Sequence, residues 1–180
     1  KLTGAVNVEQ VVNSLPQAVS GVTSNSNNPG GGVATLDLRG LGESRTLVLV
    51  NGRRYLSFDA SQLVDVNTIP QFLLDSVDVV TGGASAVYGS DAIAGVVNFR
   101  LDENLTGLRA GAQYGITDKG DGRRLQTHVA IGGSFDDNRG HVVAYGEYYK
   151  RRPIFQDARG FSRFSLGDDD GELVPAGSPT

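Results

Sequence analysis

The stretch "TGGASAVYGSDAIAGVVNFR", residues 81–100, decides how the rest of the chain is interpreted. Small side chains surround one tyrosine, Tyr88, before the sequence becomes β-branched and apolar from Gly95 onward. Glycine and alanine allow two backbone segments to lie close together, and β-branched residues favour strands. The stretch therefore predicts a tight turn, anchored by Tyr88 as its one large side chain, that leads into a strand.

Three kinds of active-site loop share this glycine-rich composition, and the spacing argues against each of them. A phosphate-binding P-loop needs a Lys-Ser/Thr pair after its last glycine, whereas Gly89 is followed by Ser90 and Asp91. Glycines at 82, 83, 89 and 95 do not fit the G-x-G-x-x-G turn that binds dinucleotides. Neither Ser85 nor Ser90 has the flanking glycines of a nucleophile elbow. We expect Asp91 to cap or pair locally rather than to catalyse.

The composition gives no sign of an enzyme, a metal protein or a nucleic-acid-binding protein. The 180 residues include 25 Gly and two His, with no Cys, Met or Trp, and the formal net charge is −4. Because no Cys or His residues cluster, no catalytic residues, cofactor or metal ligands are predicted. The acidic run at 168–172 lacks the spaced ligands of a calcium loop and is expected to be a solvated loop. No apolar stretch approaches the roughly 20 residues of a membrane helix, so a membrane role would need β-strands.

Residues 1–101 mix short helical and extended patterns. Apolar residues from Val6 to Leu15 recur at helical spacing, with Asn7 as a suitable N-cap and Pro16 as the stop. Residues 25–32, "NSNNPGGG", predict a loop. Strands are expected in "ATLDLRG" (34–40), in "TLVLVNGRRY" (46–55) with Asn51-Gly52 as a hairpin turn, in "SVDVV" (76–80) after a short helical turn in "PQFLLD" (70–75), and in "AGVVNFRL" (94–101).

Three longer segments with alternating side chains follow, at 108–116, 125–135 and 141–150. In the first two, one face is apolar and the other is polar or small, while the faces of the third are less cleanly sorted. Strands of about ten residues with one apolar face are what a transmembrane β-barrel requires. A soluble antiparallel sheet with one wet face would give the same alternation, so the pattern alone leaves both open.

Four motifs resemble, in the same order, the plug domain of TonB-dependent outer-membrane transporters. They are "NVEQVVNSLPQAV" (7–19), similar to the first plug helix, "LDLRGLG" (36–42), similar to an Arg-Gly strand, "LVLVNGRRY" (47–55), similar to a hairpin, and "LLDSVDVVTGGASAVYGSDAIAGVVNFRL" (73–101), similar to the second half of the plug. The resemblance implies an α+β plug domain over 1–101, with its amino-terminal part missing. It also implies that 102–180 supplies about three antiparallel transmembrane strands with their loops, in a fragment of a plugged barrel of about 22 strands.

For function, the resemblance implies energy-coupled uptake of a scarce nutrient across the bacterial outer membrane, with the plug gating the barrel from within its lumen. The implied partners are a TonB-type inner-membrane energy-coupling protein, whose binding box is expected before Lys1, outer-membrane lipid, and a small-molecule, glycan or peptide substrate, with no nucleic acid. The alternatives are a soluble extracellular β-rich ligand-binding module and, as the weakest, a hydrolase that uses Ser85 or Ser90.

The resemblance also suggests roles for individual residues. Candidate substrate-binding residues at the plug apices are Glu43, Arg54, Tyr55, Ser57, Phe58 and Asp59; the signature and packing residues are Gly82, Gly83, Tyr88, Gly89, Gly95 and Asn98. The family often has an Arg-Gly turn where this chain has Thr81-Gly82-Gly83, so Arg39 or Arg100 is proposed for an ion pair between plug and barrel. By strand order, 117–123 is an extracellular loop, 136–140 a periplasmic turn, and 152–180 lies in a second extracellular loop.

Overall fold

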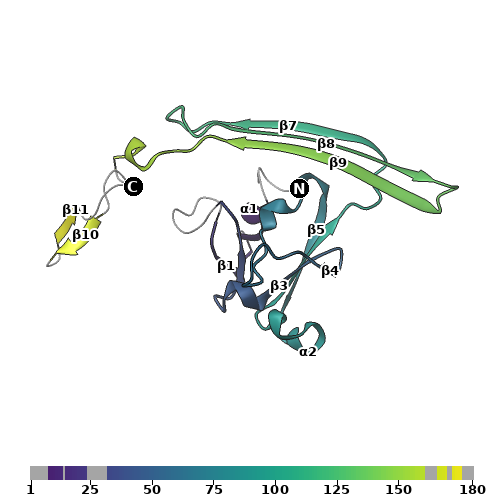
Figure 1. Ribbon diagram of the computed structural model, residues 1–180, viewed down its shortest axis with the longest axis horizontal. Coiled ribbons are helices and arrows are strands. Elements are labelled where there is room, and N and C mark those ends of the chain that lie inside the picture. Colours follow the sequence, from purple (N-terminus) through teal and green to yellow (C-terminus); the bar gives the residue numbers. More distant parts are fainter. Residues whose placement is uncertain (1–7, 14, 24–31, 161–165, 170–171, 176–180) are drawn as a thin grey trace. The chain divides into compact units, whose positions relative to one another are not determined.

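A computed structural model describes residues 8–13, 15–23, 32–160, 166–169 and 172–175 (Figure 1). The chain divides into two compact units, residues 1–105 and 106–180. The proposed N-cap Asn7 and residues 25–31 of the predicted loop lie outside the described residues.

The first unit is a mixed α+β fold. Its principal sheet has the strand order β4-β3-β6-β5, in which β3 and β6 are parallel and the other neighbours are antiparallel. These strands are β3 (Thr46–Val50), β4 (Arg53–Arg54), β5 (Leu74–Thr81) and β6 (Gly95–Leu101). A smaller antiparallel pair joins β1 (Ala18–Ser20) to β2 (Leu36–Leu38). The helical elements are α1 (Val8–Asn13), η1 (Glu43–Arg45), η2 (Val66–Thr68), η3 (Gln71–Leu73), α2 (Ser85–Tyr88) and η4 (Ser90–Ala92).

Most strand predictions are confirmed, and two differences have physical causes. The strand β1 was missed because three residues are too few to show a period. The segment between β5 and β6 is not one tight turn, since it contains the short helical elements α2 and η4. Helices this short are not stable alone, so tertiary contacts must hold them.

The principal sheet is covered on both faces. Along β3 the side chains alternate, so Val48 joins one buried cluster while Leu47 and Leu49 join the other. The larger cluster consists of Val8, Val12, Ala34, Leu36, Leu38, Val48, Val66, Ile69, Ala94, Val97 and Phe99. The smaller one consists of Leu47, Leu49, Ala84, Ala92 and Val96. Burial on both sides explains why β3 reads as a continuous apolar run rather than as an alternating pattern.

Two buried alanines hold the 81–95 segment on the sheet. Ala84 and Ala92 are buried, with 4% and 0% of their surface exposed, and they pack on Leu47, Leu49 and Val96. Tyr88 is 40% exposed within this unit, and its role as the large anchor of the segment stays a prediction. A methyl side chain allows the short helical elements to lie directly on the sheet, which a tyrosine ring would prevent.

Two asparagines fasten the far end of the same sheet. The hairpin turn has positive φ at Asn51 (49°) and Gly52 (75°), as a type I′ turn requires. The Asn98 Oδ1 accepts a hydrogen bond from the Gly52 backbone N–H at 2.9 Å, and the Asn51 Oδ1 accepts one from the Leu101 N–H at 2.7 Å. The hairpin tip is thereby tied to the neighbouring strand β6.

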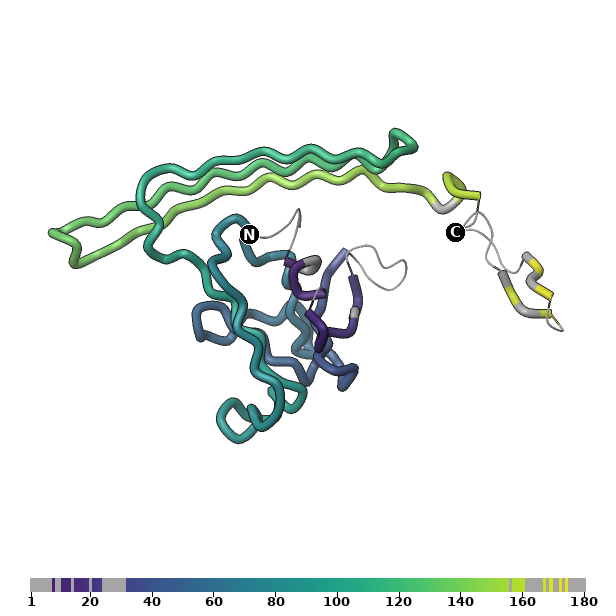
Figure 2. The backbone as a smooth tube through the Cα atoms, turned by 180° about the vertical axis from the view of Figure 1, so that it is seen from behind, coloured from purple at the N-terminus to yellow at the C-terminus, as the bar shows by residue number. Residues whose placement is uncertain are grey.

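The second unit is an antiparallel sheet of three long strands that run side by side (Figures 1 and 2). They are β7 (Gly107–Gly115), β8 (Arg124–Phe135) and β9 (Gly140–Arg151). Register pairs Leu108 with Ile131 and Ile131 with Ala144, which places most apolar side chains of β7 and β8 on one face, while β9 also carries Val143, Tyr145 and Tyr149 on the other. This apolar face comprises Leu108, Ala110, Ala112, Tyr114, Leu125, Thr127, Val129, Ile131, Phe135, Val142, Ala144, Gly146 and Tyr148.

The unit continues with η5 (Gln156–Ala158) and a hairpin of β10 (Leu166–Asp169) and β11 (Glu172–Pro175). Asp168 and Asp169 therefore lie in β10 and Glu172 in β11, so the prediction of a loop over 168–172 is wrong for these residues. These charged residues form strands because β10 and β11 satisfy each other's backbone hydrogen bonds, which stabilises the extended conformation. Among the described residues, no helix has both the length and the apolar character needed to cross a membrane.

The close approach at Gly95 gives a test of the packing of the first unit. Gly95 has φ 148°, and a Cβ there would collide with the Val80 carbonyl and lie 2.9 Å from the Leu38 Cδ1. We expect Gly95→Ala to lower the opening free energy of the β6 amides by about 2–5 kcal/mol, the sum of backbone strain and overpacking.

The matched control is Gly83→Ala, which also has positive φ (67°) but has no heavy atom within 4 Å of the added Cβ. Its cost should be about 1–2 kcal/mol, from backbone conformation alone. Hydrogen exchange on the full-length protein measures both values, and equal losses in the two variants would contradict the packing argument.

Candidate ligand-binding surface

Arg54 clamps the segment between β5 and β6. Its Nη1 donates to the Asp91 Oδ2 at 2.5 Å, and its Nη2 donates to the Tyr88 carbonyl at 2.5 Å. One guanidinium therefore holds both α2 and η4. The hydrogen bond from Arg54, with a smaller one from Ser90, holds the pKa of the Asp91 carboxyl below its usual range. The expectation that Asp91 pairs locally is confirmed for the bond from Ser90, whereas its main partner, Arg54, lies 37 residues away in the sequence.

Hydrogen bonds from the η1 region hold two further segments of the first unit, and Arg39 lies near Gly82. The Glu43 Oε1 accepts a hydrogen bond from the Val22 N–H at 2.8 Å, so this carboxylate holds the chain that follows β1. The Ala94 N–H donates to the Arg45 carbonyl at 2.9 Å, which ties η1 to the start of β6. Arg39 has φ 62°, and its guanidinium nitrogens lie 3.9 Å from where a Cβ on Gly82 would be.

The loop that follows β4 holds the remaining predicted apex residues. Tyr55 is half-buried, packs on the larger cluster, and its hydroxyl lies 3.4 Å from the Thr68 carbonyl. The Asp59 Oδ1 accepts hydrogen bonds from the Ser61 and Leu63 N–H groups, each at 3.1 Å, and so fixes the loop conformation. Ser57 and Phe58 have exposed side chains, and Phe58 is 47% exposed.

The predicted site residues therefore fall into separate groups. Arg54 meets Tyr88 and Gly89, since its Nη2 lies 3.8 Å from where a Cβ on Gly89 would be. Asn98 lies in the middle of β6, in the register row of Leu49 and Arg54, and its side chain accepts a hydrogen bond from the Gly52 N–H of the hairpin. Glu43, Arg54, Tyr55 and Asp59 all have structural contacts, which leaves Ser57 and Phe58 as the predicted apex residues with the most available side chains.

A polar hollow of about 540 Å³ lies at the other end of the principal sheet, where the chain leaves the first unit. It is lined by Asn51, Gly52, Asp75, Asn98, Arg100, Leu101, Asp102, Glu103 and Asn104. Arg100 lies 3.9 Å from Asp78 in an exposed ion pair within this unit, while no ion pair between described residues includes Arg39. The pair between plug and barrel thus stays a prediction for both arginines.

The described residues offer little for catalysis. The Ser90 hydroxyl donates to the Asp91 Oδ1 at 3.2 Å, and the first unit contains no histidine that could act as its base. In the second unit, the Ser134 Oγ lies 3.1 Å from the His141 Nδ1 in a cross-strand pair on an exposed edge. Within the described ranges, no three His, Cys, Asp or Glu residues group as metal ligands would.

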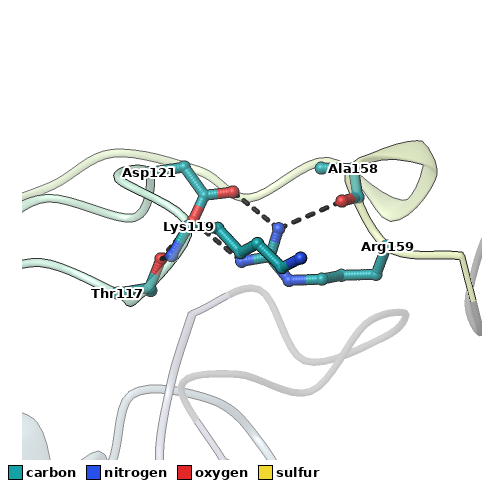
Figure 3. A network of polar contacts seen from close by, with 5 residues as sticks. All are labelled: Thr117, Lys119, Asp121, Ala158 and Arg159. Carbon is teal, nitrogen blue, oxygen red and sulfur yellow. Dashed lines mark hydrogen bonds and ion pairs between the residues drawn. The ribbon is translucent and has the colours of Figure 1, made fainter.

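Asp121 and Arg159 join two segments of the second unit that are 38 residues apart (Figure 3). The Arg159 Nη1 and Nη2 donate to the two Asp121 carboxylate oxygens at 2.7 and 2.8 Å, and the Thr117 Oγ1 donates at 2.5 Å. These bonds, that from Arg159 first, hold the pKa of Asp121 well below its usual range. The pair fastens the 117–123 loop to η5, and nothing in the sequence indicated it because the partners share no local pattern.

The fold consists of a mixed sheet with short helices in the first unit and long antiparallel strands in the second. Comparison with known families assigns the first unit to a class. The model of the TonB-dependent receptor plug domain family matches residues 1–96, more than half of the chain, and the chain belongs to this family.

Solved receptors show the same fold. A mutant ferric enterobactin receptor PfeA from Pseudomonas aeruginosa, in complex with enterobactin, matches with a TM-score of 0.68 and 21% identity, over 95% of this chain and 26% of that chain. The siderophore receptor PirA from Pseudomonas aeruginosa matches with 0.56 and 24%, over 83% and 25%. The unliganded ferric citrate transporter FecA matches with 0.57 and 23%, over 81% and 23%. The present chain spans about a quarter of the length of these receptors.

The Arg54 clamp predicts a local change in stability. We expect Arg54→Gln to speed hydrogen exchange at the amides of Val87, Tyr88 and Gly89, because the bonds to Tyr88 and Asp91 are lost together. Arg53→Gln is the control, since Arg53 is equally exposed on β4 and makes no polar contact with the described residues. Faster exchange in both variants would contradict the clamp.

The clamp should also depend on pH in one direction. Because the folded pKa of Asp91 is lowered from 3.8, the pair stabilises the segment above pH 3.8 and the benefit is lost as the pH falls through the lower folded value. Solvent exposure of both side chains, 54% and 33%, keeps this contribution small. Asp91→Asn should remove the acid-induced loosening when the opening free energy is followed against pH.

Proposed function

We propose that this chain is the plug and the first three barrel strands of a receptor that takes up a nutrient across the bacterial outer membrane with energy supplied through a TonB-type protein. In this proposal residues 1–101 gate the pore and 102–180 belong to the barrel wall. The observation that supports it most directly is the plug-family match over 1–96, followed at once by long antiparallel strands with one apolar face.

Exposure of that face favours membrane strands over a soluble sheet. Leu108, Tyr114, Ile131 and Phe135 have 58% to 70% of their surface exposed, and all lie on the apolar face. Contiguous apolar surface of this kind marks an interaction site in a water-soluble protein and is the lipid-facing side of an outer-membrane strand. The opposite face carries Arg109, Gln113, Gln126 and Glu147, as a polar lumen would require, together with Val143, Tyr145 and Tyr149 of β9.

Gating would begin at the amino-terminal side of the plug. A pull applied ahead of α1 reaches a six-residue helix and then a three-residue strand before it reaches the principal sheet. The β1–β2 ladder has three residue pairs, whereas β6 is flanked on both sides by β3 and β5. Since fewer hydrogen bonds and less buried surface hold β1, it should open first.

Ligand would be bound on the exposed loop at Ser57 and Phe58. An exposed aromatic ring next to a hydroxyl offers both stacking and hydrogen bonding to a small molecule, glycan or peptide. The ligands named for PfeA, PirA and FecA belong to those receptors, because identities of 21% to 24% support a shared fold.

The proposed uptake has a direct test. Cells that express the full-length protein as their only receptor should accumulate its ligand when the energy-coupling protein is present and lose accumulation when that protein is deleted. Ligand binding to the cell surface should persist in both strains, because the partner supplies energy and not affinity. Undiminished accumulation in the deletion strain would refute energy-coupled uptake.

A substitution tests the binding loop. Phe58→Ala should raise the ligand Kd by at least about fivefold, the equivalent of about 1 kcal/mol for an aromatic contact. Val80→Ala is the control, because Val80 is exposed to 48%, close to the 47% of Phe58, but lies on the edge strand β5. Equal Kd values for wild type and Phe58→Ala, measured by calorimetry, would remove this loop from the binding surface.

A further inference from the structure

Five cationic residues gather at one end of the second unit's sheet. They are Arg123, Arg124, Lys150, Arg151 and Arg152, where β8 begins and β9 ends. Register pairs Arg124 with Arg151, and the Arg152 N–H donates to the Arg123 carbonyl at 2.9 Å, which extends the ladder by one pair. The formal net charge of the chain is −4, so this basic end stands out against the overall charge.

The strand period sorts these cations onto two faces. Lys150 is in register with Leu125, which is in register with Tyr114, so all three lie on the apolar face. Arg123 and Arg152 are each two residues from this row along their strands and share its side. We refer to Arg123, Lys150 and Arg152 as the rim triad. Arg124 and Arg151 lie on the opposite face at the same level.

The rim triad is exposed, and its positive charges face one another. All three residues are exposed, and among the described residues no hydrogen bond or ion pair engages their side-chain nitrogens. The nearby carboxylate of Asp121 is already bound by Arg159 and Thr117. Like charges on adjacent strands destabilise a sheet, so an anion placed between them would relieve that repulsion.

Next to the triad lies the start of the apolar band. Tyr114 and Tyr148 are exposed to 61% and 55% on the same face, followed by Val129 and Ile131 further along. Tyrosines at the end of an apolar strand face lie at the level of lipid headgroups in membrane strands. If the sheet lies in the membrane as proposed, the rim triad lies at the level of the lipid headgroups rather than of the acyl chains.

We propose that the rim triad binds the phosphate of a membrane-lipid headgroup in the leaflet at the 117–123 end of the sheet. Arginine guanidinium groups match phosphate oxygens in a bidentate geometry, and lysine adds a point charge. A lipid is favoured over free phosphate because the apolar face and both tyrosines continue directly from the triad and would contact the rest of the lipid. The inference rests on the proposed membrane location of this sheet.

The test uses the full-length protein in detergent with three probes: a phosphorylated glucosamine lipid (lipid A), its dephosphorylated form, and inorganic phosphate. Native mass spectrometry measures the affinity for each lipid. The variant Arg123→Gln/Lys150→Gln/Arg152→Gln should bind the phosphorylated lipid about fivefold more weakly per charge, on the order of a hundredfold in total. The variant Arg123→Lys/Arg152→Lys, which keeps every charge, should retain most of the affinity and guards against a folding defect.

Arg124→Gln/Arg151→Gln is the matched control, because it removes cations from the same strands and level on the opposite face. It should bind the phosphorylated lipid as wild type does, and the dephosphorylated lipid should bind wild type and the triple variant alike. An equal loss in this control, equal binding of both lipids by wild type, or complete displacement of the lipid by inorganic phosphate would overturn the inference. Failure of wild type to retain either lipid would overturn the membrane location itself, whereas the uptake test addresses the receptor function separately.

Discussion

The plug depends on the parallel pairing of β3 and β6, because these two strands supply residues to both buried clusters of the first unit. The strand β6 begins at Gly95, where the backbone lies so close to the Val80 carbonyl of β5 and to the Leu38 side chain that a Cβ would not fit. At this end the connection from β5 returns over the sheet through α2 and η4. At the other end Asn51 and Asn98 bind backbone N–H groups of Leu101 and Gly52. One strand pair is thus fastened by shape at one end and by hydrogen bonds at the other.

The sequence was most informative where periodicity or turn chemistry determined the local structure. The Asn51-Gly52 hairpin and the three long strands of the second unit follow directly from turn preference and alternation. The helix α2 could not be predicted, because four residues have no helical period and are held by Arg54, 34 residues away from Tyr88. The prediction of a loop over the acidic run at 168–172 was wrong for a related reason. Local charge favours a loop only when no partner strand is present, and here β10 pairs with β11.

For the candidate site too, the sequence predicted what depends on local composition and not what depends on contacts between distant residues. Exposed loops were predicted from composition, yet composition does not reveal that Glu43 holds Val22 or that Asp59 holds its own loop. Both carboxylates accept hydrogen bonds from backbone N–H groups, so each holds the local conformation of the chain. Removing such residues from the list of candidates leaves Ser57 and Phe58, so the structure narrows a prediction that the sequence made broadly.

The hydrogen bonds of the plug also give it a preferred direction of opening. At its carboxyl end, β6 is paired on both sides, and the Leu101 and Asp102 N–H groups donate to the Asn51 side chain and the Leu73 carbonyl at 2.7 and 2.8 Å. Only residues 102–106 then precede β7, so tension from that side acts on many bonds in parallel. At the amino-terminal side the three-residue strand β1 has β2 as its partner. A force on the amino-terminal side would therefore meet the weaker β1–β2 pair before the principal sheet, as the proposed opening of the plug requires.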